Sequence, residues 1–87
     1  MSVLKEENIE NLFDVHSLRY FLQVADSGGF SKATAVLNVP QPTLSRSIRR
    51  IEEHFKARLF DRNGRGASLT EAGESLYQHG KAILLRL

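Results

Sequence analysis

Apolar residues recur at helical spacing along the first part of the chain. One group at i, i+3, i+4 and i+7 predicts a helix that Asp14 caps and that Gly28-Gly29 ends. A short second helix is expected from a Ser31 N-cap to about Asn38. The apolar residues expected on the buried faces of these two helices are Leu18, Phe21, Leu22, Ala25, Ala33, Val36 and Leu37. Residues 1–13 are acidic and lack a clear period, so we expect a flexible leader there.

A third helix is predicted to begin at Gln41 and Pro42, because proline is tolerated in the first turn of a helix. At about 100° per residue, one face of this helix carries Pro42, Arg46 and Arg49, with Ser45 at its edge. The opposite face is apolar and consists of Leu44, Ile48, Ile51 and Phe55. Such a pattern is typical of a solvated surface helix and also of a helix that enters a DNA groove.

Beyond the third helix the helical period is lost. Residues 57–70, ARLFDRNGRGASLT, hold two short apolar pieces around a turn-rich centre, in which Asn63-Gly64 is a strong hairpin signal. Thr70 is a suitable N-cap for a long helix over residues 71–87. The pattern therefore predicts a mainly α fold. It consists of a winged helix-turn-helix at residues 14–70, with a three-helix core and a two-stranded wing, and then a long C-terminal linker helix.

Composition narrows the classes of function. The length of 87 residues suits one small domain, and the absence of cysteine excludes disulfides, zinc fingers and cysteine nucleophiles. The three histidines are far apart, with no second ligand at metal-site spacing, so we expect no metal, no cofactor and no catalytic residue, and hence no enzyme. No apolar run approaches the roughly 20 residues that span a bilayer. We expect a cytoplasmic protein without a membrane partner.

Charge is distributed unevenly along the chain. The formal net charge is +2, but residues 1–30 carry two basic and five acidic side chains, a net charge of −3. Residues 31–66 carry eight basic and three acidic side chains, a net charge of +5. The adjacent Glu52 and Glu53 are expected to be solvated or to pair with Arg49 or Arg50. The positive charge thus lies in the middle segment, where a polyanion could bind.

A short helix, a turn through NVPQ and a second helix have the spacing of a helix-turn-helix. The second helix of such a unit presents its N-terminal residues to base edges in the major groove. Gln41 can bond to adenine, Arg46 can bind guanine through two hydrogen bonds, and Pro42 offers an apolar contact to a thymine methyl group. Thr43 and Ser45 are short enough to bond to a base or a phosphate while the backbone stays close.

Five further residues are candidates for contacts to the DNA backbone or the minor groove. Arg49 and Arg50 lie one turn further along the third helix, and Lys32 begins the second, so we expect all three at phosphates. Arg62 and Arg65 flank the glycine-containing turn, and a basic hairpin tip can enter a narrow minor groove. The alternative for the hairpin is that its charges protect exposed strand edges.

Residues 18–74 resemble the N-terminal DNA-binding domain of LysR-type transcriptional regulators. The most specific pieces are LRYF, QPTLSRSI, LFDR and LTEAG, in that order and at the family's spacing. The resemblance implies a winged helix-turn-helix, a linker helix that pairs two subunits, and an effector-binding domain that this chain lacks. It implies base reading by Gln41, Pro42, Thr43, Ser45 and Arg46, a wing-tip contact by Arg65, and backbone contacts by Ser31 and Lys32.

Four positions depart from the family's pattern. Gly29 stands where the family usually has serine, and Thr34 where it usually has alanine. Pro40 replaces a common serine, so the third helix lacks an N-cap oxygen, a loss of about 1 kcal/mol. Lys56 replaces a common glycine after that helix, so we expect a different exit turn.

The last helix carries a broader apolar surface than one packing contact needs. We expect its N-terminal half to be buried within the subunit and its C-terminal half to form a homodimer. The residues assigned to this dimer helix are Leu76, Tyr77, Gly80, Ile83, Leu84 and Leu87. Because ILLRL carries no stop signal, we expect a fragment cut within the linker helix.

The predicted function is sequence-specific binding of a homodimer to a dyad-symmetric DNA operator. Two alternatives remain open: a protein-interaction module whose basic face binds an acidic partner, and an architectural binder that does not distinguish sequences. Gln41, Ser45 and Arg46 suit a DNA groove, whereas a protein-binding face would more often carry exposed aromatic residues there.

Overall fold

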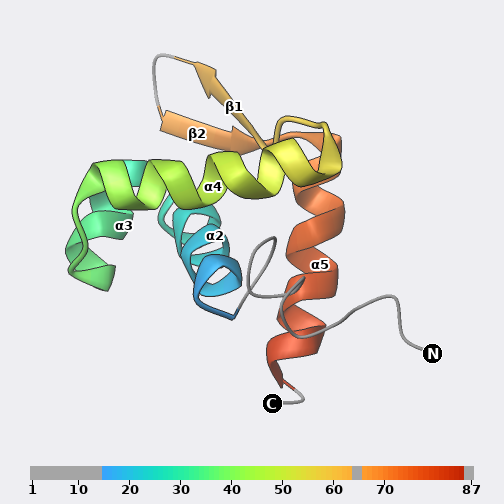
Figure 1. Cartoon of the computed structure of the whole chain (residues 1–87), viewed down its shortest axis with the longest axis horizontal. Coiled ribbons are helices and arrows are strands. Elements are labelled where there is room, and N and C mark those ends of the chain that lie inside the picture. The colour runs from blue at the N-terminus through green and yellow to red at the C-terminus, as the bar shows by residue number, and fades with distance from the viewer. Residues whose placement is uncertain (1–14, 64–65, 86–87) are drawn as a thin grey trace.

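The computed structural model describes residues 15–63 and 66–85, which form helices around a small antiparallel hairpin (Figure 1). The prediction of a mainly α winged helix-turn-helix is confirmed. The leader, the Asp14 cap and the end of the linker helix lie outside the described residues. The elements are α2 (Val15–Ser27), α3 (Phe30–Leu37), α4 (Gln41–Phe55), β1 (Phe60–Asn63), β2 (Gly66–Leu69) and α5 (Glu71–Leu85).

Helix α2 is the centre of the fold, and α3, α4, α5 and β2 all contact it. Figure 1 shows α4 crossing above α2, with α3 near one end of α4, α5 near the other, and the hairpin drawn above α4 in this view. The Phe60 ring lies 5.4 Å from that of Phe21 and 5.7 Å from that of Phe30, so the start of the wing is anchored in the core. The buried apolar residues are Leu18, Phe21, Leu22, Val24, Phe30, Ala33, Leu44, Ile48, Ile51, Leu59 and Phe60.

Two residues predicted to be buried are exposed. The Val36 side chain is 65% exposed, because the inner face of α3 is formed by Phe30 and Ala33, with Leu37 beside them. Around the helix axis, Phe30 and Val36 lie on opposite sides of Ala33, so Val36 points away from the inner face. Phe55 is 49% exposed because it is the last residue of α4, whereas the buried stripe of the helix ends at Ile51.

The start of α3 differs from its prediction. The N-cap is Gly29, in extended conformation and without a side-chain capping bond, and Ser31 lies inside the first turn. The helix therefore begins two residues earlier than predicted, which brings the Phe30 ring onto Phe60 in the core. The carbonyl of Ser31 instead accepts a hydrogen bond from the Thr34 hydroxyl at 2.6 Å.

The turn between α3 and α4 follows the prediction. Asn38 ends α3 in the left-handed conformation with φ of 58°. Pro40 caps α4 without a side-chain bond, as the missing serine predicted. Its carbonyl accepts the backbone N–H groups of Thr43 at 3.1 Å and Leu44 at 3.2 Å, so the proline still begins the helix.

The exit turn of α4 keeps the left-handed geometry that a glycine would adopt. Lys56 has φ of 54°, and its N–H donates to the Glu52 carbonyl. The expectation that this turn differs from the family's stays a prediction. Because a side chain with a Cβ is disfavoured in this conformation, the substitution changes the energy of the turn rather than its shape.

The hairpin and the last helix begin where the sequence places them. Asn63 pairs with Gly66, so residues 64–65 connect the strands, and these two lie outside the described residues. The predicted turn at Asn63-Gly64 falls partly on these two residues, so its position stays a prediction. The Thr70 hydroxyl accepts the N–H of Gly73 at 3.0 Å, which confirms Thr70 as the N-cap of α5.

Candidate nucleic-acid interface

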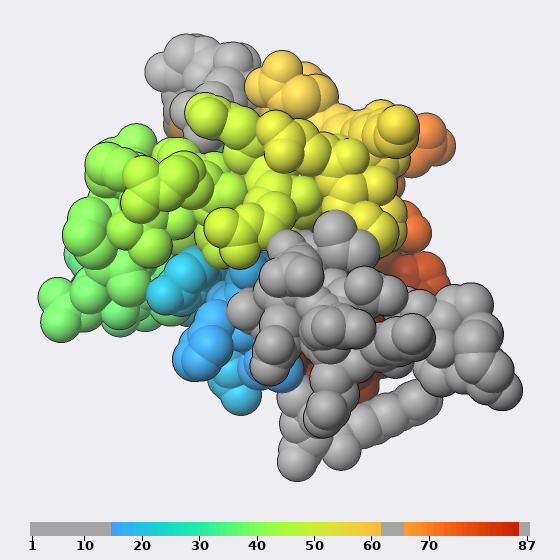
Figure 2. Space-filling view, in the orientation of Figure 1, coloured from blue at the N-terminus to red at the C-terminus, as the bar shows by residue number. Residues whose placement is uncertain are grey.

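The outer face of α4 is exposed along its whole length. Gln41, Pro42, Arg46, Arg49 and Arg50 are exposed. In Figure 2, α4 (green to yellow) lies across the surface of the molecule, so its outer side is not covered by another element in that view. The face on which the sequence places the reading residues is therefore accessible, and it is basic.

Two of the predicted base-reading residues are only partly accessible. Thr43 and Ser45 are half-buried at the edges of the exposed face, where only part of each side chain is accessible. A hydroxyl in that position forms a hydrogen bond only with a ligand that comes close to the helix backbone.

The underside of α4 fixes the direction in which this face points. Leu44, Ile48 and Ile51 are buried against the core, with exposures of 3% or less. The hydroxyls of Ser17 on α2 and Ser47 on α4 lie 3.0 Å apart, in a part-buried hydrogen bond. Polar residues 30 positions apart carry no periodic signal, so this pair could not be predicted from the sequence. The bond restricts rotation of α4 on α2.

The predicted backbone-contacting residues of α3 lie at the start of that helix. Ser31 and Lys32 are both exposed in its first turn. Helices α3 and α4 are joined by the turn at residues 38–40 and contact each other. Their exposed residues are therefore held in one relative arrangement.

The wing is attached to the turn between α2 and α3. The N–H of Ala67 donates to the Gly28 carbonyl at 3.1 Å. A Cβ on Gly66 would lie 2.6 Å from the same oxygen, and φ of Gly66 is 131°, so only glycine suits this position. Arg65 and the side chain of Arg62 lie outside the described residues, and their predicted contacts stay predictions.

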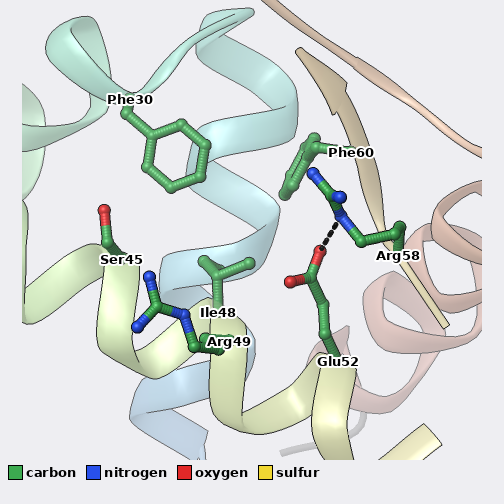
Figure 3. Close-up of a pocket in the computed structure, with 7 residues that line it drawn as sticks. All are labelled: Phe30, Ser45, Ile48, Arg49, Glu52, Arg58 and Phe60. Carbon is green, nitrogen blue, oxygen red and sulfur yellow. Dashed lines mark ion pairs between the residues drawn. The ribbon is translucent and has the colours of Figure 1, made fainter. Parts of the chain in front are cut away.

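A pocket of about 370 Å³ lies between α4 and the start of the wing. Figure 3 shows Ser45 and Arg49 on one side of it and Arg58 on the other, with Glu52 between them. The Glu52 carboxylate accepts the N–H of Leu59 at 2.9 Å and lies 3.8 Å from Nε of Arg58. The ion partner found for Glu52 is therefore Arg58 rather than the predicted Arg49 or Arg50.

Helix α5 packs on α2 along most of its described length. Gly80 is buried, and a Cβ there would lie 2.7 Å from Cδ1 of Leu18. Tyr77 and Leu84 also pack against the core from α5. Internal packing thus extends well into the C-terminal half of α5, contrary to the prediction, and Gly80 belongs to it. A helix contacts a neighbouring helix along one face. Internal contacts and a dimer contact are therefore expected on different faces of α5, not in its two halves.

A polar cluster reinforces the contact between α5 and α2. The Tyr77 hydroxyl donates to Oδ1 of Asp26 at 2.5 Å. Nζ of Lys81 lies 3.8 Å from Oδ2 of Asp26 and 5.1 Å from the centre of the Tyr77 ring. The hydrogen bond with Tyr77 and then the charge of Asp26 raise the pKa of Lys81 above its ordinary value.

The other face of α5 is apolar and accessible. Ile83 is 48% exposed on this face, whereas Leu85, two residues later and 86% exposed, points in nearly the opposite direction. Leu76, seven residues before Ile83, is half-buried on the same side. Leu87 lies outside the described residues. Ile83 thus keeps a position compatible with the predicted dimer contact, whereas Leu76 already packs in part against the core of its own subunit.

Other kinds of site are not found in the described part of the chain. Within residues 15–63 and 66–85, no group of three histidine or acidic side chains could hold a metal ion. In the same ranges, no helix is both long enough and apolar enough to cross a membrane.

Comparison with known sequences identifies a family. The model of the bacterial regulatory helix-turn-helix proteins of the lysR family matches residues 15–74. The HTH-type transcriptional regulator BudR of Klebsiella aerogenes is 44% identical over 71 residues, which are 82% of this chain and 50% of that protein. The nitrogen assimilation regulatory protein nac of Escherichia coli K12 is 39% identical over 67 residues, 77% of this chain and 22% of that protein. The chain thus spans half the length of BudR and less of nac.

Solved structures show the same fold. The CbnR DBD–DNA complex is similar with a TM-score of 0.78 and 32% identity, covering 83% of each chain. The BenM DBD in complex with benA site 1 DNA has a TM-score of 0.80 and 34% identity, covering 85% of this chain and 86% of that one. For full-length BenM the TM-score is 0.78, with 24% of that chain covered.

Proposed function

Because the chain belongs to the lysR family of bacterial regulatory helix-turn-helix proteins, we propose that it is the DNA-binding domain of a transcriptional regulator that reads a dyad-symmetric operator as a homodimer. One observation carries the proposal: helix α4, packed on the core, exposes Arg46, Arg49 and Arg50 on its outer side, against one exposed acidic residue, Glu53. Similar domains of CbnR and BenM occur in DNA complexes, which supports the same ligand here.

In this proposal the N-terminal part of α4 enters the major groove. Gln41 and Arg46 bond to base edges, and Pro42 contacts a thymine methyl group or another apolar edge. Thr43 and Ser45 are half-buried, so they bond to the base or phosphate nearest the helix backbone. These five residues supply the choice of sequence.

Affinity comes mainly from basic side chains at phosphates. Arg49 and Arg50 are exposed further along α4, and Lys32 is exposed with Ser31 at the start of α3. Arg62 belongs to the same group, and Arg65 at the tip of the wing enters the minor groove. Because contacts to phosphates are independent of sequence, they hold the domain on any DNA and fix its orientation.

A second copy completes the reader through α5. The accessible apolar face of this helix, which includes Leu76 and Ile83, pairs with the same face of the partner, so the two recognition helices are related by a two-fold axis. Dyad symmetry in the operator follows from that axis. The effector of the whole regulator binds a domain outside this chain, and the regulator acts in the bacterial cytoplasm.

Selection of binding sites from random duplex DNA tests the proposal. An enriched inverted repeat is expected if the chain binds as a specific dimer, and a single enriched half-site if it binds as a specific monomer. Salt-sensitive binding without enrichment would instead indicate an architectural binder. Absence of DNA binding would contradict the proposal and favour an acidic protein partner.

A further inference from the structure

The inference rests on the proposed function and concerns the pocket between α4 and the wing. In a DNA duplex, one sugar–phosphate strand separates each stretch of major groove from the adjacent minor groove. If α4 occupies the major groove and the wing the adjacent minor groove, that strand must pass between them. The side chains that line the gap therefore meet its phosphates, whatever the base sequence.

Two arginines line this gap from different elements. Arg49 comes from α4, and Arg58 comes from the connection between α4 and β1. Figure 3 shows the two side chains on opposite sides of the pocket, with Ile48 between them at its base. The Arg58 side chain is 71% exposed, so solvent and ligands reach it. Arg58 lies beyond the end of α4 and outside its periodic pattern, so the pattern does not single it out.

The acidic residue in the pocket orients Arg58 rather than cancelling both arginines. Glu52 is only 19% exposed, and its carboxylate already accepts the N–H of Leu59. Its ion pair is with Nε of Arg58, which leaves the two terminal amino groups of the guanidinium for another anion. Arg49, Glu52 and Arg58 together keep a formal charge of +1.

We propose that Arg58, held by Glu52, binds together with Arg49 a phosphate of the strand that crosses between the two grooves. The ligand is the DNA backbone, so Arg58 contributes affinity without sequence choice. Arg58 thus makes a third kind of DNA contact, located between the contacts of helix α4 and those of the wing tip.

The first experiment compares Arg58→Ala with the unaltered chain on random duplex DNA at several salt concentrations. We expect affinity to fall about tenfold at moderate salt, and the slope of log K against log salt to decrease by about 0.9, the value for one phosphate. Arg58→Lys should keep the slope because it keeps the charge. Arg19→Ala removes an exposed arginine from α2 and is the matched control, with an unchanged slope expected.

A structural role for Arg58 gives a different result. If it served only to pair with Glu52, Arg58→Ala would lower the melting temperature and leave the salt slope equal to that of Arg19→Ala, which would overturn the proposal. Arg58→Gln, which keeps most of the stem, replaces the alanine variant if that variant does not fold.

The second experiment locates the phosphate. In the selected site, single phosphates are replaced in turn by neutral methylphosphonates. We expect one position in each half-site, between the major-groove and minor-groove contacts, to weaken the unaltered chain but not Arg58→Ala. Equal losses in both proteins at every position would contradict the inference while leaving the proposed function intact. Failure of the unaltered chain to bind any DNA would remove both.

Discussion

Arg46 and Ile48 are two residues apart in α4, and they face in opposite directions. Ile48 is 3% exposed in the core, whereas Arg46 is exposed on the outer face. The apolar stripe orients the helix, and the polar stripe is what remains for a ligand. At the scale of single residues, then, the same periodicity that folds the domain also presents its candidate reading side chains.

Arg46→Ala should distinguish base reading from general attraction. Loss of a bidentate contact to guanine is expected to weaken binding to the selected site by about 1–3 kcal/mol and to relax the choice at one base pair. Competition binding against single-base variants of the site measures this effect. Arg50→Ala is the comparison, with a uniform loss on all sequences and a salt slope smaller by about one. An equal loss for Arg46→Ala on every sequence would refute its reading role.

Lys56 is a residue at which the fold tolerates an unfavourable conformation. A non-glycine residue in the left-handed region costs about 1–2 kcal/mol, partly offset because glycine has more freedom in the unfolded chain. We therefore expect Lys56→Gly to raise the free energy of unfolding by about 0.5–1 kcal/mol in urea titrations. Asn38→Gly should gain less, because asparagine tolerates this conformation. A loss of stability in Lys56→Gly would contradict the interpretation.

At the scale of elements, glycines decide how closely α5 approaches its neighbours. A Cβ on Gly73 would lie 2.2 Å from the backbone oxygen of Leu59, which cannot rotate away. A Cβ on Gly80 would meet Cδ1 of Leu18 at 2.7 Å, the end of a side chain that can move. The start of α5 therefore has a stricter requirement for glycine than its middle.

The two alanine substitutions should have different effects on stability. Gly73→Ala is expected to lower the free energy of unfolding by about 2–3 kcal/mol through overpacking against the backbone. Gly80→Ala should cost less, because Leu18 can shift and because alanine favours a helix interior by up to about 1 kcal/mol. Chemical denaturation of both variants measures the difference. Equal losses would show that the Leu18 side chain is held as firmly as the backbone.

The elements themselves could be predicted from the sequence, but their ends and some of their faces could not. Phe30 entered α3 because its ring packs on Phe60, a contact between residues 30 positions apart. In a helix of two turns, periodicity alone does not decide which face is buried, and packing left Val36 on the exposed face. Local propensity cannot resolve such choices, because the deciding neighbours are distant in sequence.

At the scale of the whole molecule, α5 is the element through which the proposed homodimer forms. Its inner face, with Tyr77 and Gly80, is occupied by α2, and its outer face carries Ile83. The Asp26–Tyr77–Lys81 cluster fixes the direction of α5 relative to the helix-turn-helix. In a two-fold dimer this direction determines the separation of the two reading helices, and hence the spacing of half-sites.

Ile83→Ser should weaken pairing without affecting the fold. Burial of an isoleucine contributes about 1.5–3 kcal/mol, and a two-fold interface contains the residue twice. We expect cooperative occupation of the two half-sites to fall at least tenfold, while affinity for one half-site is unchanged. Quantitative footprinting on the selected site measures both. Val36→Ser, at an exposed valine on α3, is the matched control, and equal cooperativity in the two variants would exclude Ile83 from the interface.

The sequence by itself determined the order of the elements, the buried stripe of α4, the Thr70 cap and the basic exposed face, because each depends on residues within a few positions of one another. Only the tertiary structure decided that Glu52 pairs with Arg58 across the pocket from Arg49 (Figure 3), that the serines of α2 and α4 bond, and that Gly80 lies against Leu18. These contacts join residues from different elements or on either side of a turn. Their partners are selected by the packing of the elements rather than by periodicity.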